Sequence, residues 1–225
     1  MGANNGHNGT SGLAFYNNTE VVRDFVERSM HTGVVIGKQI TEQYYGSPHH
    51  KSYYLGCSTG GRQGFKAVQT YPEDFDGVVA GAPAIAWNGL QSWSAHFLGI
   101  FGANASSPAY IPLGLWTLVH KEILNQCDGL DGKVDGILED PSLCQFRPEA
   151  LLCGASSNGT SCLTSAQAGA LRETFSDYHG VNGTLIYPRM QPGSEAVSSV
   201  VLYANGAFPY STDWNRYVLY SEPPF

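Results

Sequence analysis

A serine between two glycines stands where a β-like run of residues gives way to a helical one, and this junction constrains the fold more than any other feature. The serine is Ser58 within Gly56-Cys57-Ser58-Thr59-Gly60, with the β-like run at 51–55 and the helical run at 61–68. A second β-like run follows at 77–81. A serine presented on a tight strand-to-helix turn is a nucleophile elbow. The order strand, elbow, helix, strand therefore predicts an α/β fold with the Ser58 hydroxyl exposed.

The elbow predicts both a nucleophile and a site for negative charge. A helix that begins after Ser58 would direct its free N–H groups and the positive end of its dipole toward the turn. Ser58 is therefore the expected nucleophile, and the backbone N–H of Thr59 the expected oxyanion donor. A chance match in a chain with 27 glycines is the competing interpretation, and the flanking strand and helix weigh against it. Cys57 is a second candidate nucleophile, but the residue before an elbow serine points its side chain elsewhere.

Three segments around this junction resemble the tannase and feruloyl esterase family. They are 56–63, 71–77 (Tyr-Pro-Glu-Asp-Phe-Asp-Gly) and 6–9 (Gly-His-Asn-Gly), and the resemblance extends over essentially the whole chain. It implies a secreted serine ester hydrolase with an α/β-hydrolase core and a large inserted lid domain. It also implies that the cysteine before the nucleophile, here Cys57, is disulfide-bonded to a cysteine beside the catalytic histidine.

The catalytic partners of Ser58 are expected outside this sequence. In α/β-hydrolases the acid and the histidine follow the serine in the chain. The histidines that follow the serine lack a neighbouring cysteine; they are His96, His120 and His179. The resemblance places the acid and a His-Cys pair beyond Phe225. Because polar turn residues also follow Met1 at once, we expect a fragment in which Cys57 has lost its partner and which hydrolyses no ester by itself.

The character of the sequence changes after residue 86. Aromatic residues interleaved with Gly, Pro and Ser follow, so we expect a partial α/β-hydrolase core at 1–86 and a lid domain at 87–225 that is incomplete at its C-terminus. Within the core, apolar residues at helical spacing predict core helices over 19–29 and 33–44. Aromatic rings of the lid would suit a pocket for a phenolic acyl group, although such rings more often pack an ordinary core.

Four of the five cysteines fall within 36 positions of the predicted lid: Cys127, Cys144, Cys153 and Cys162. Four cysteines allow three pairings, and the sequence alone does not choose among them. A zinc site is an alternative, but the C-x-x-C spacing and the nearby histidines that tetrahedral zinc uses are missing. The family resemblance implies bridges from Cys127 to Cys144 and from Cys153 to Cys162.

An acidic, glycine-rich segment at 127–140 is the second chemical feature. Its alternating Asp and Gly residues disfavour a helix and predict a loop. Carboxylates that converge on a loop repel one another unless a cation lies between them, and oxygen ligands suit Ca²⁺. Solvated Asp-Gly turns are the alternative, and the spacing is not that of an EF-hand. The resemblance implies one structural calcium ion in the lid, bound by the side chains of Asp128, Asp131 and Asp135 and by the carbonyls of Lys133 and Ile137.

Composition favours an extracellular globular protein. The net charge is −7 and the 12 lysines and arginines form no cluster, which argues against nucleic acid and anionic membranes as partners. The chain has no apolar run near the roughly 18 residues of a spanning helix. Five Asn-x-Ser/Thr sequences predict glycosylation in a secreted protein; they begin at Asn8, Asn17, Asn104, Asn158 and Asn182.

Together these features predict a secreted serine carboxylic ester hydrolase. Its substrates would be small esters of plant phenolic acids, feruloyl or galloyl, free or attached to cell-wall polysaccharide or tannin. The reaction would pass through an acyl-enzyme on Ser58. Two alternatives stay open. One is a lipase-like or peptidase-like hydrolase on the same fold. The other is a calcium-stabilised binding module in which Ser58 is only a structural turn.

Overall fold

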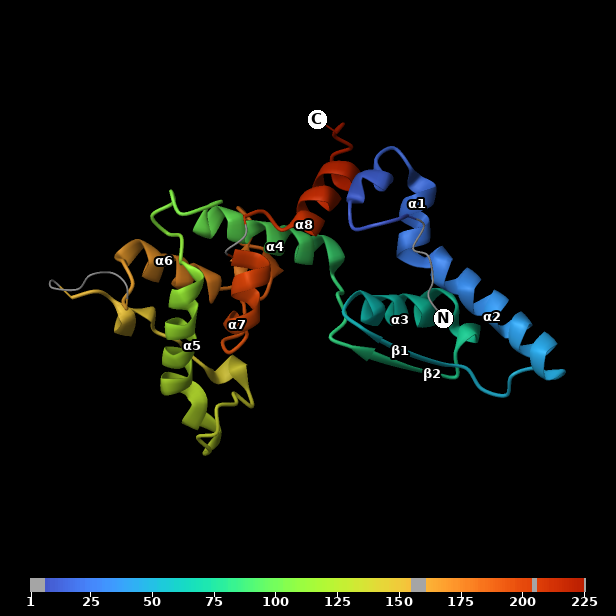
Figure 1. The fold of residues 1–225 in the computed structure, drawn as a ribbon, viewed down its shortest axis with the longest axis horizontal. Helices are drawn as coiled ribbons and strands as arrows, with labels where there is room; N and C mark the ends of the chain where they lie inside the picture. Colours follow the sequence, from blue (N-terminus) through green and yellow to red (C-terminus); the bar gives the residue numbers. More distant parts are fainter. Residues whose placement is uncertain (1–6, 155–160, 204–205, 225) are drawn as a thin grey trace. The chain divides into compact units, whose positions relative to one another are not determined.

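The computed structural model describes residues 7–154, 161–203 and 206–224 and divides the chain into two compact units. The first unit comprises Met1–Leu90 and Asp213–Phe225, and the second comprises Gln91–Thr212. The expected division into 1–86 and 87–225 therefore differs from the structure at both ends of the second unit. The sequence assigned the last residues to the lid, whereas they belong to the first unit (Figure 1).

Aromatic packing explains why the last residues belong to the first unit. Trp214 lies with its ring centroid 6.2 Å from that of Phe25 and 5.5 Å from that of Trp87. Its indole N–H donates to the side-chain oxygen of Asn88 at 3.0 Å. Trp214 and Tyr217 are buried together with Phe15, so the C-terminal helical turn completes a core whose other members come from the N-terminal part of the chain.

The centre of the first unit is a strand, a helix and a second strand, as predicted. β1 (Tyr53–Cys57) pairs in parallel with β2 (Gly77–Gly81), with Tyr53 opposite Gly77 and Cys57 opposite Gly81. α3 (Thr59–Thr70) connects them and lies along one face of the pair (Figure 1). α3 ends before Pro72, which begins a 3₁₀ turn. The strand assigned to 51–55 lies two residues further along the chain, and the second strand lies where the sequence placed it.

The two helices predicted over 19–29 and 33–44 form one continuous helical segment. It consists of α1 (Thr19–Arg23), a π-helical turn (Asp24–Arg28) and α2 (Ser29–Tyr45). The side-chain oxygen of Asn18 caps its start by accepting the Val21 N–H at 3.3 Å, and Gly46 ends it with φ 71°. The prediction of a core face was wrong for the C-terminal half of α2, because the apolar side chains there are exposed, including Ile36, Ile40 and Tyr44.

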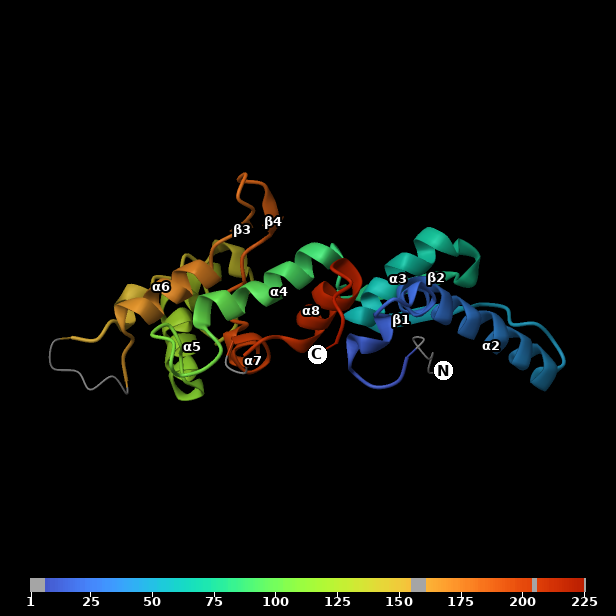
Figure 2. The same ribbon diagram turned by 90° about the horizontal axis from the view of Figure 1, so that it is seen from above.

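The second unit is mainly helical. Its helices and strands are α4 (Trp87–Phe101, which begins in the first unit), α5 (Leu113–Cys127), α6 (Ser165–Thr174), α7 (Glu195–Ser198), α8 (Pro209–Asp213) and the short pair β3 (Tyr178–His179) and β4 (Leu185–Tyr187). β3 and β4 are antiparallel and form the hairpin that projects upward in Figure 2. α6 begins with a capping box, in which Thr164 and Gln167 exchange side-chain to backbone hydrogen bonds.

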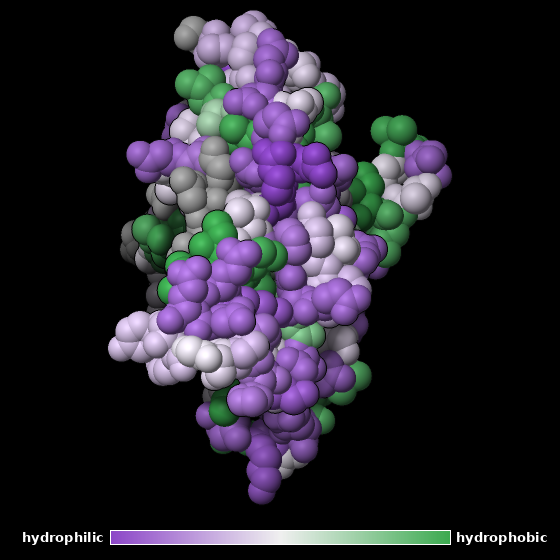
Figure 3. Space-filling view, turned by 90° about the vertical axis from the view of Figure 1, so that its right-hand side faces the viewer, coloured by the Kyte–Doolittle hydropathy of each residue, from purple (hydrophilic) through white to green (hydrophobic). Residues whose placement is uncertain are grey.

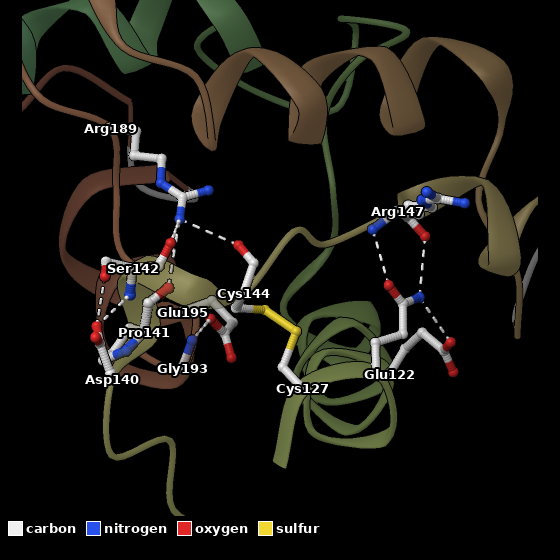
Figure 4. Close-up of a disulfide and its surroundings, with 11 residues drawn as sticks. Glu122, Cys127, Asp140, Pro141, Ser142, Cys144, Arg147, Arg189, Gly193 and Glu195 are labelled. Atoms are coloured by element: carbon white, nitrogen blue, oxygen red, sulfur yellow. Dashed lines mark hydrogen bonds between the residues drawn. A yellow bond between two sulfur atoms is a disulfide. The ribbon is translucent and has the colours of Figure 1, made fainter. Parts of the chain in front are cut away.

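Both expected disulfides are present. Cys127 is bonded to Cys144, and Cys153 is bonded to Cys162. The segment before Cys144 is also held by Arg189, whose guanidinium donates to the carbonyl of Ser142 at 2.7 Å and of Cys144 at 3.1 Å (Figure 4). The disulfide and the guanidinium together fix this loop against the end of α5.

One face of the β1–β2 pair is apolar and exposed. Tyr53, Leu55 and Val79 are 72%, 81% and 62% exposed. Parallel strands in α/β proteins are ordinarily covered on both faces, so this surface is unusual for such a sheet.

Hydrophobic residues also reach the surface in several separate patches on the face drawn in Figure 3. Among the described residues no helix has the length and apolar character required to cross a membrane.

Candidate active site

Ser58 adopts a backbone conformation that few non-glycine residues take. Its φ is 59° and its ψ is −116°, and the residue is exposed between β1 and α3. Main-chain hydrogen bonds hold it on both sides. The Ser58 N–H donates to the Gly81 carbonyl at 3.0 Å, and the Ser58 carbonyl accepts N–H groups from Arg62 at 3.1 Å and Ala84 at 3.2 Å. The sharp turn between strand and helix is thus fixed by its neighbours.

Two glycines allow the helix to lie this close to the strands. A Cβ atom on Gly56 would lie 2.6 Å from the carbonyl carbon and oxygen of Gly60, and one on Gly61 would lie 2.5 Å from the Gly81 carbonyl oxygen. Neither contact is possible for a larger residue without displacing the backbone. Of the two glycines of the predicted elbow, Gly56 therefore acts through close packing of the main chain, whereas a Cβ on Gly60 would have its nearest neighbour 3.5 Å away. The second close approach is at Gly61, the residue after the elbow.

The start of α3 provides backbone N–H groups of the kind that stabilise an oxyanion. The first turn of α3, which begins at Thr59, has N–H groups with no acceptor within the helix, and the helix dipole adds positive potential there. Tyr54 supports this turn, because its hydroxyl donates to the Gly60 carbonyl at 2.8 Å. Burial raises the pKa of Tyr54, so the phenol stays protonated and keeps its role as a donor.

The described residues do not bring a catalytic base to Ser58. None of the hydrogen bonds between them joins the Ser58 hydroxyl to a histidine. The three downstream histidines have other partners: His96 pairs with Glu173, His120 with Glu195, and His179 with the Asp177 carbonyl. Cys57 is exposed and is not disulfide-bonded. The sequence had assigned neither the base nor the cysteine's partner to this chain.

The acidic segment begins with a 3₁₀ turn at Asp128–Asp131, which the sequence did not predict, and continues as the predicted loop; its carboxylates accept backbone N–H groups. Both oxygens of the buried Asp128 lie 3.0–3.1 Å from the Gly136 nitrogen. The side chains of Asp131 and Asp135 accept the N–H groups of Lys133 at 2.7 Å and Ile137 at 3.1 Å. Within the described part of the chain, no three His, Cys, Asp or Glu side chains are gathered in the way a metal ion requires. The calcium ligands stay a prediction.

The predicted glycosylation sites lie at the surface where they are described. The asparagine side chains concerned are exposed: Asn8, Asn17, Asn104 and Asn182. Asn158 lies outside the described residues. Exposure is a requirement for glycan attachment, so the geometry permits modification at these four positions.

Sequence reasoning missed a cavity beside the elbow. Its volume is about 660 Å³, and Phe25, Trp87 and Trp214 line it together with Arg62. The guanidinium carbon of Arg62 lies 4.7 Å from the Phe25 ring centroid and 5.0 Å from that of Trp87. Burial lowers the pKa of Arg62. Arg62 lies in the helical run that follows the elbow, but nothing local in the sequence indicates that residues 25 and 214 lie near it.

The strand, turn and helix around Ser58 define an α/β protein of the α/β-hydrolase type, and solved structures share the fold. An esterase from Aspergillus oryzae superposes with a TM-score of 0.94 at 59% identity, covering 99% of this chain and 44% of that one. Feruloyl esterase B from A. oryzae superposes with a TM-score of 0.93 at 52% identity, covering 99% of this chain and 45% of that one. Tannin acyl hydrolase from A. niger, 22% identical with a TM-score of 0.72, shares the fold over 92% of this chain and 40% of its own.

The chain belongs to the tannase and feruloyl esterase family, whose model matches residues 1–221. A probable feruloyl esterase B-1 from A. flavus is 60% identical over 223 residues, and a probable feruloyl esterase B-2 from A. terreus is 56% identical over 223 residues. Each match covers 99% of this chain and 42% of the relative. The chain thus spans less than half the length of these relatives.

Proposed function

We propose that this chain carries the nucleophile of a carboxylic ester hydrolase that acts on esters of plant phenolic acids. The observation that supports it most directly is the exposed Ser58 at φ 59°, held between the end of a parallel strand and the start of a helix. Relatives named feruloyl esterase match almost the whole chain. The substrates would be feruloyl or galloyl esters, free or attached to cell-wall polysaccharide or tannin, and the enzyme would be secreted and glycosylated.

In the proposed reaction the Ser58 oxygen attacks the ester carbonyl and the alcohol leaves, which forms an acyl-enzyme that water then hydrolyses. The N–H groups at the start of α3, beginning with Thr59, would bind the negative charge that develops on the carbonyl oxygen. A serine hydroxyl without a neighbouring base is a weak nucleophile. Because the described residues supply no base to Ser58, we expect this chain by itself to show essentially no turnover.

Covalent labelling tests the nucleophile. In a protein of the relatives' length that contains this chain, a fluorophosphonate should modify Ser58, and Ser58→Ala should abolish both labelling and hydrolysis of methyl ferulate. Ser47→Ala, which changes an exposed serine in the loop after α2, should leave both unchanged. Labelling of a different serine, or full activity in Ser58→Ala, would refute the proposal and favour a binding module.

We also propose that the loop 128–137 binds one structural calcium ion. The donors would be the side chains of Asp128, Asp131 and Asp135 with the carbonyls of Lys133 and Ile137. Oxygen donors on a loop fit the coordination that Ca²⁺ prefers. The adjacent Cys127–Cys144 disulfide holds the same loop, so the ion would reinforce the second unit and take no part in bond cleavage.

Removal of the metal tests this site without reference to activity. A chelator should lower the unfolding temperature of the second unit, since a ligand at 100 times its Kd adds about 2.7 kcal/mol of stability. Asp131→Asn should remove the effect of added Ca²⁺, whereas Glu122→Gln, on α5 outside the loop, should preserve it. Equal unfolding temperatures of the untreated and chelated protein would contradict the proposal.

A further inference from the structure

The cavity beside the elbow has the composition of a ligand site. It lies wholly within the first unit, between the π-helical turn at 24–28, α3 and residues 84–88, with Trp214 on its wall. Its lining includes neither Ser58 nor Thr59. The cavity is therefore separate from the hydroxyl that would attack an ester, although Ala84 in its wall is hydrogen-bonded to the Ser58 carbonyl.

Arg62 brings a positive charge into this cavity with no carboxylate to balance it. No ion pair between described residues involves Arg62, and its Nε is buried without a hydrogen-bond partner. Within the described part of the chain, its terminal nitrogens reach only the carbonyl oxygens of Val26 and Phe25, at 3.5 and 3.4 Å, which are long for hydrogen bonds. A partly buried guanidinium with such weak partners keeps much of its capacity to bind an anion.

The other lining residues add a second positive charge and three aromatic rings. Lys66 is the second charged residue of the wall, and its Nζ lies 3.3 Å from a carboxylate oxygen of Glu27 outside the cavity. None of the described residues that line the cavity is acidic. The three rings of the wall stand at an angle to one another, with centroids 5.5–6.2 Å apart. Such rings offer faces and edges on which a planar ring can pack.

We propose that this cavity binds a small planar aromatic carboxylate. The carboxylate would lie on the guanidinium of Arg62, and the ring would pack against Phe25, Trp87 and Trp214. Arginine pairs with carboxylates through two parallel hydrogen bonds, which a neutral ester or alcohol cannot reproduce. The volume of about 660 Å³ accommodates a single phenolic acid with room to spare. If the proposed hydrolysis also holds, the acid it releases would belong to this class, but binding does not depend on that reaction.

Calorimetric titration of this chain with 4-hydroxycinnamate tests the site. We expect saturable binding of the acid, and binding at least tenfold weaker for the uncharged 4-hydroxycinnamyl alcohol. Arg62→Met should weaken acid binding about 10- to 100-fold, the loss expected for a charge-assisted pair. Arg62→Lys keeps the positive charge but loses the two parallel N–H groups, so its affinity for the acid should lie between those of the parent and of Arg62→Met. Arg172→Met, which removes an exposed arginine of the second unit, should bind as the parent does.

Two further variants separate this site from the elbow and from folding defects. Ser58→Ala should bind the acid with unchanged affinity, so a failure of the proposed hydrolysis would not affect the result. Trp214→Phe, which keeps a ring in the wall, should weaken binding while the thermal transition shows a folded protein. Equal affinity for acid and alcohol, unchanged affinity in Arg62→Lys and Trp214→Phe, or no saturable binding at millimolar acid would overturn the proposal.

Discussion

Among the described residues, most of the buried apolar side chains belong to the second unit, whereas the first unit leaves an apolar sheet face exposed. Among the described residues 25 hydrophobic side chains are buried, and five of them belong to the first unit: Phe15, Met30, Ala67, Trp214 and Tyr217. Both disulfides lie in the second unit. The strands that carry the elbow, by contrast, present Leu55 and Val79 to solvent.

This contrast shows that the elbow does not owe its shape to a large core. Ser58 is held by main-chain hydrogen bonds to Gly81, Arg62 and Ala84 and by the close approach that Gly56 and Gly61 permit. The helices of the second unit are held by side-chain packing and covalent cross-links. Changes in side-chain volume should therefore matter most in the second unit, and changes in backbone clearance most in the first.

A matched pair of leucines gives the largest expected difference. Leu171 on α6 is fully buried, and Leu55 on β1 is 81% exposed. Leu171→Ala should lower the free energy of unfolding of the second unit by about 2–5 kcal/mol, because it removes packed methyl groups and leaves a cavity. Leu55→Ala should cost less than about 1 kcal/mol in the first unit. Hydrogen exchange of peptides from each unit measures both, and equal costs would break the comparison.

Removal of a disulfide tests the same comparison between the two units. Replacement of Cys127 and Cys144 together by alanine should destabilise the second unit by roughly 3 kcal/mol, since the bridge closes a loop with a sequence separation of 17. The first unit should keep its exchange protection. The matched control is Cys57→Ala, which removes a free cysteine and should change neither unit. Equal loss of protection in both units would show that they unfold together.

Substitution of two adjacent glycines of α3 tests how closely the helix backbone must approach the strands. Gly61→Ala would place a Cβ 2.5 Å from the Gly81 carbonyl oxygen, and the resulting displacement should cost about 1–3 kcal/mol in the first unit. Gly60→Ala is the control, because its nearest neighbour, the Tyr54 hydroxyl, would be 3.5 Å away. Urea unfolding followed by hydrogen exchange compares the two. Similar stability of both variants would mean that the close approach at Gly61 is not limiting.

The smallest effect concerns the carboxylate of Asp76, the residue before β2. It accepts hydrogen bonds from the Lys51 ammonium and the Ser52 N–H, each at 2.8 Å, and these two residues lie just before β1. The hydrogen bond from Lys51, followed by that from Ser52, lowers the pKa of Asp76. A lowered folded-state pKa stabilises the fold above the unfolded pKa of about 3.9, and this contribution disappears as the pH falls through the folded value.

Asp76→Asn should therefore destabilise the first unit slightly at pH 6 and not at pH 2. Thermal unfolding at both pH values measures the difference between parent and variant. Glu42→Gln, which changes an exposed acidic position on α2, is the control variant. A difference that grows as the pH falls would contradict the assignment.

The sequence by itself determined the local features that depend on neighbours along the chain. The run from Gly56 to Gly60 predicted the elbow, and the glycines of the acidic segment predicted a loop. The family resemblance supplied both disulfide pairings. The elbow and the turns of the acidic segment could be predicted because turn geometry, like the end of α3 before Pro72, is set by local backbone sterics. The two disulfide pairings are confirmed by the structure.

Only the tertiary structure decided which distant residues meet. It placed residues 213–225 with the first unit, exposed Ile36 and Ile40 on a helix expected to be buried, and brought Phe25, Arg62 and Trp214 around one cavity. Periodicity reports that a helix has an apolar face but not what covers that face. The packing of aromatic rings across nearly 190 positions of sequence depends on the whole chain and leaves no local signal at either end.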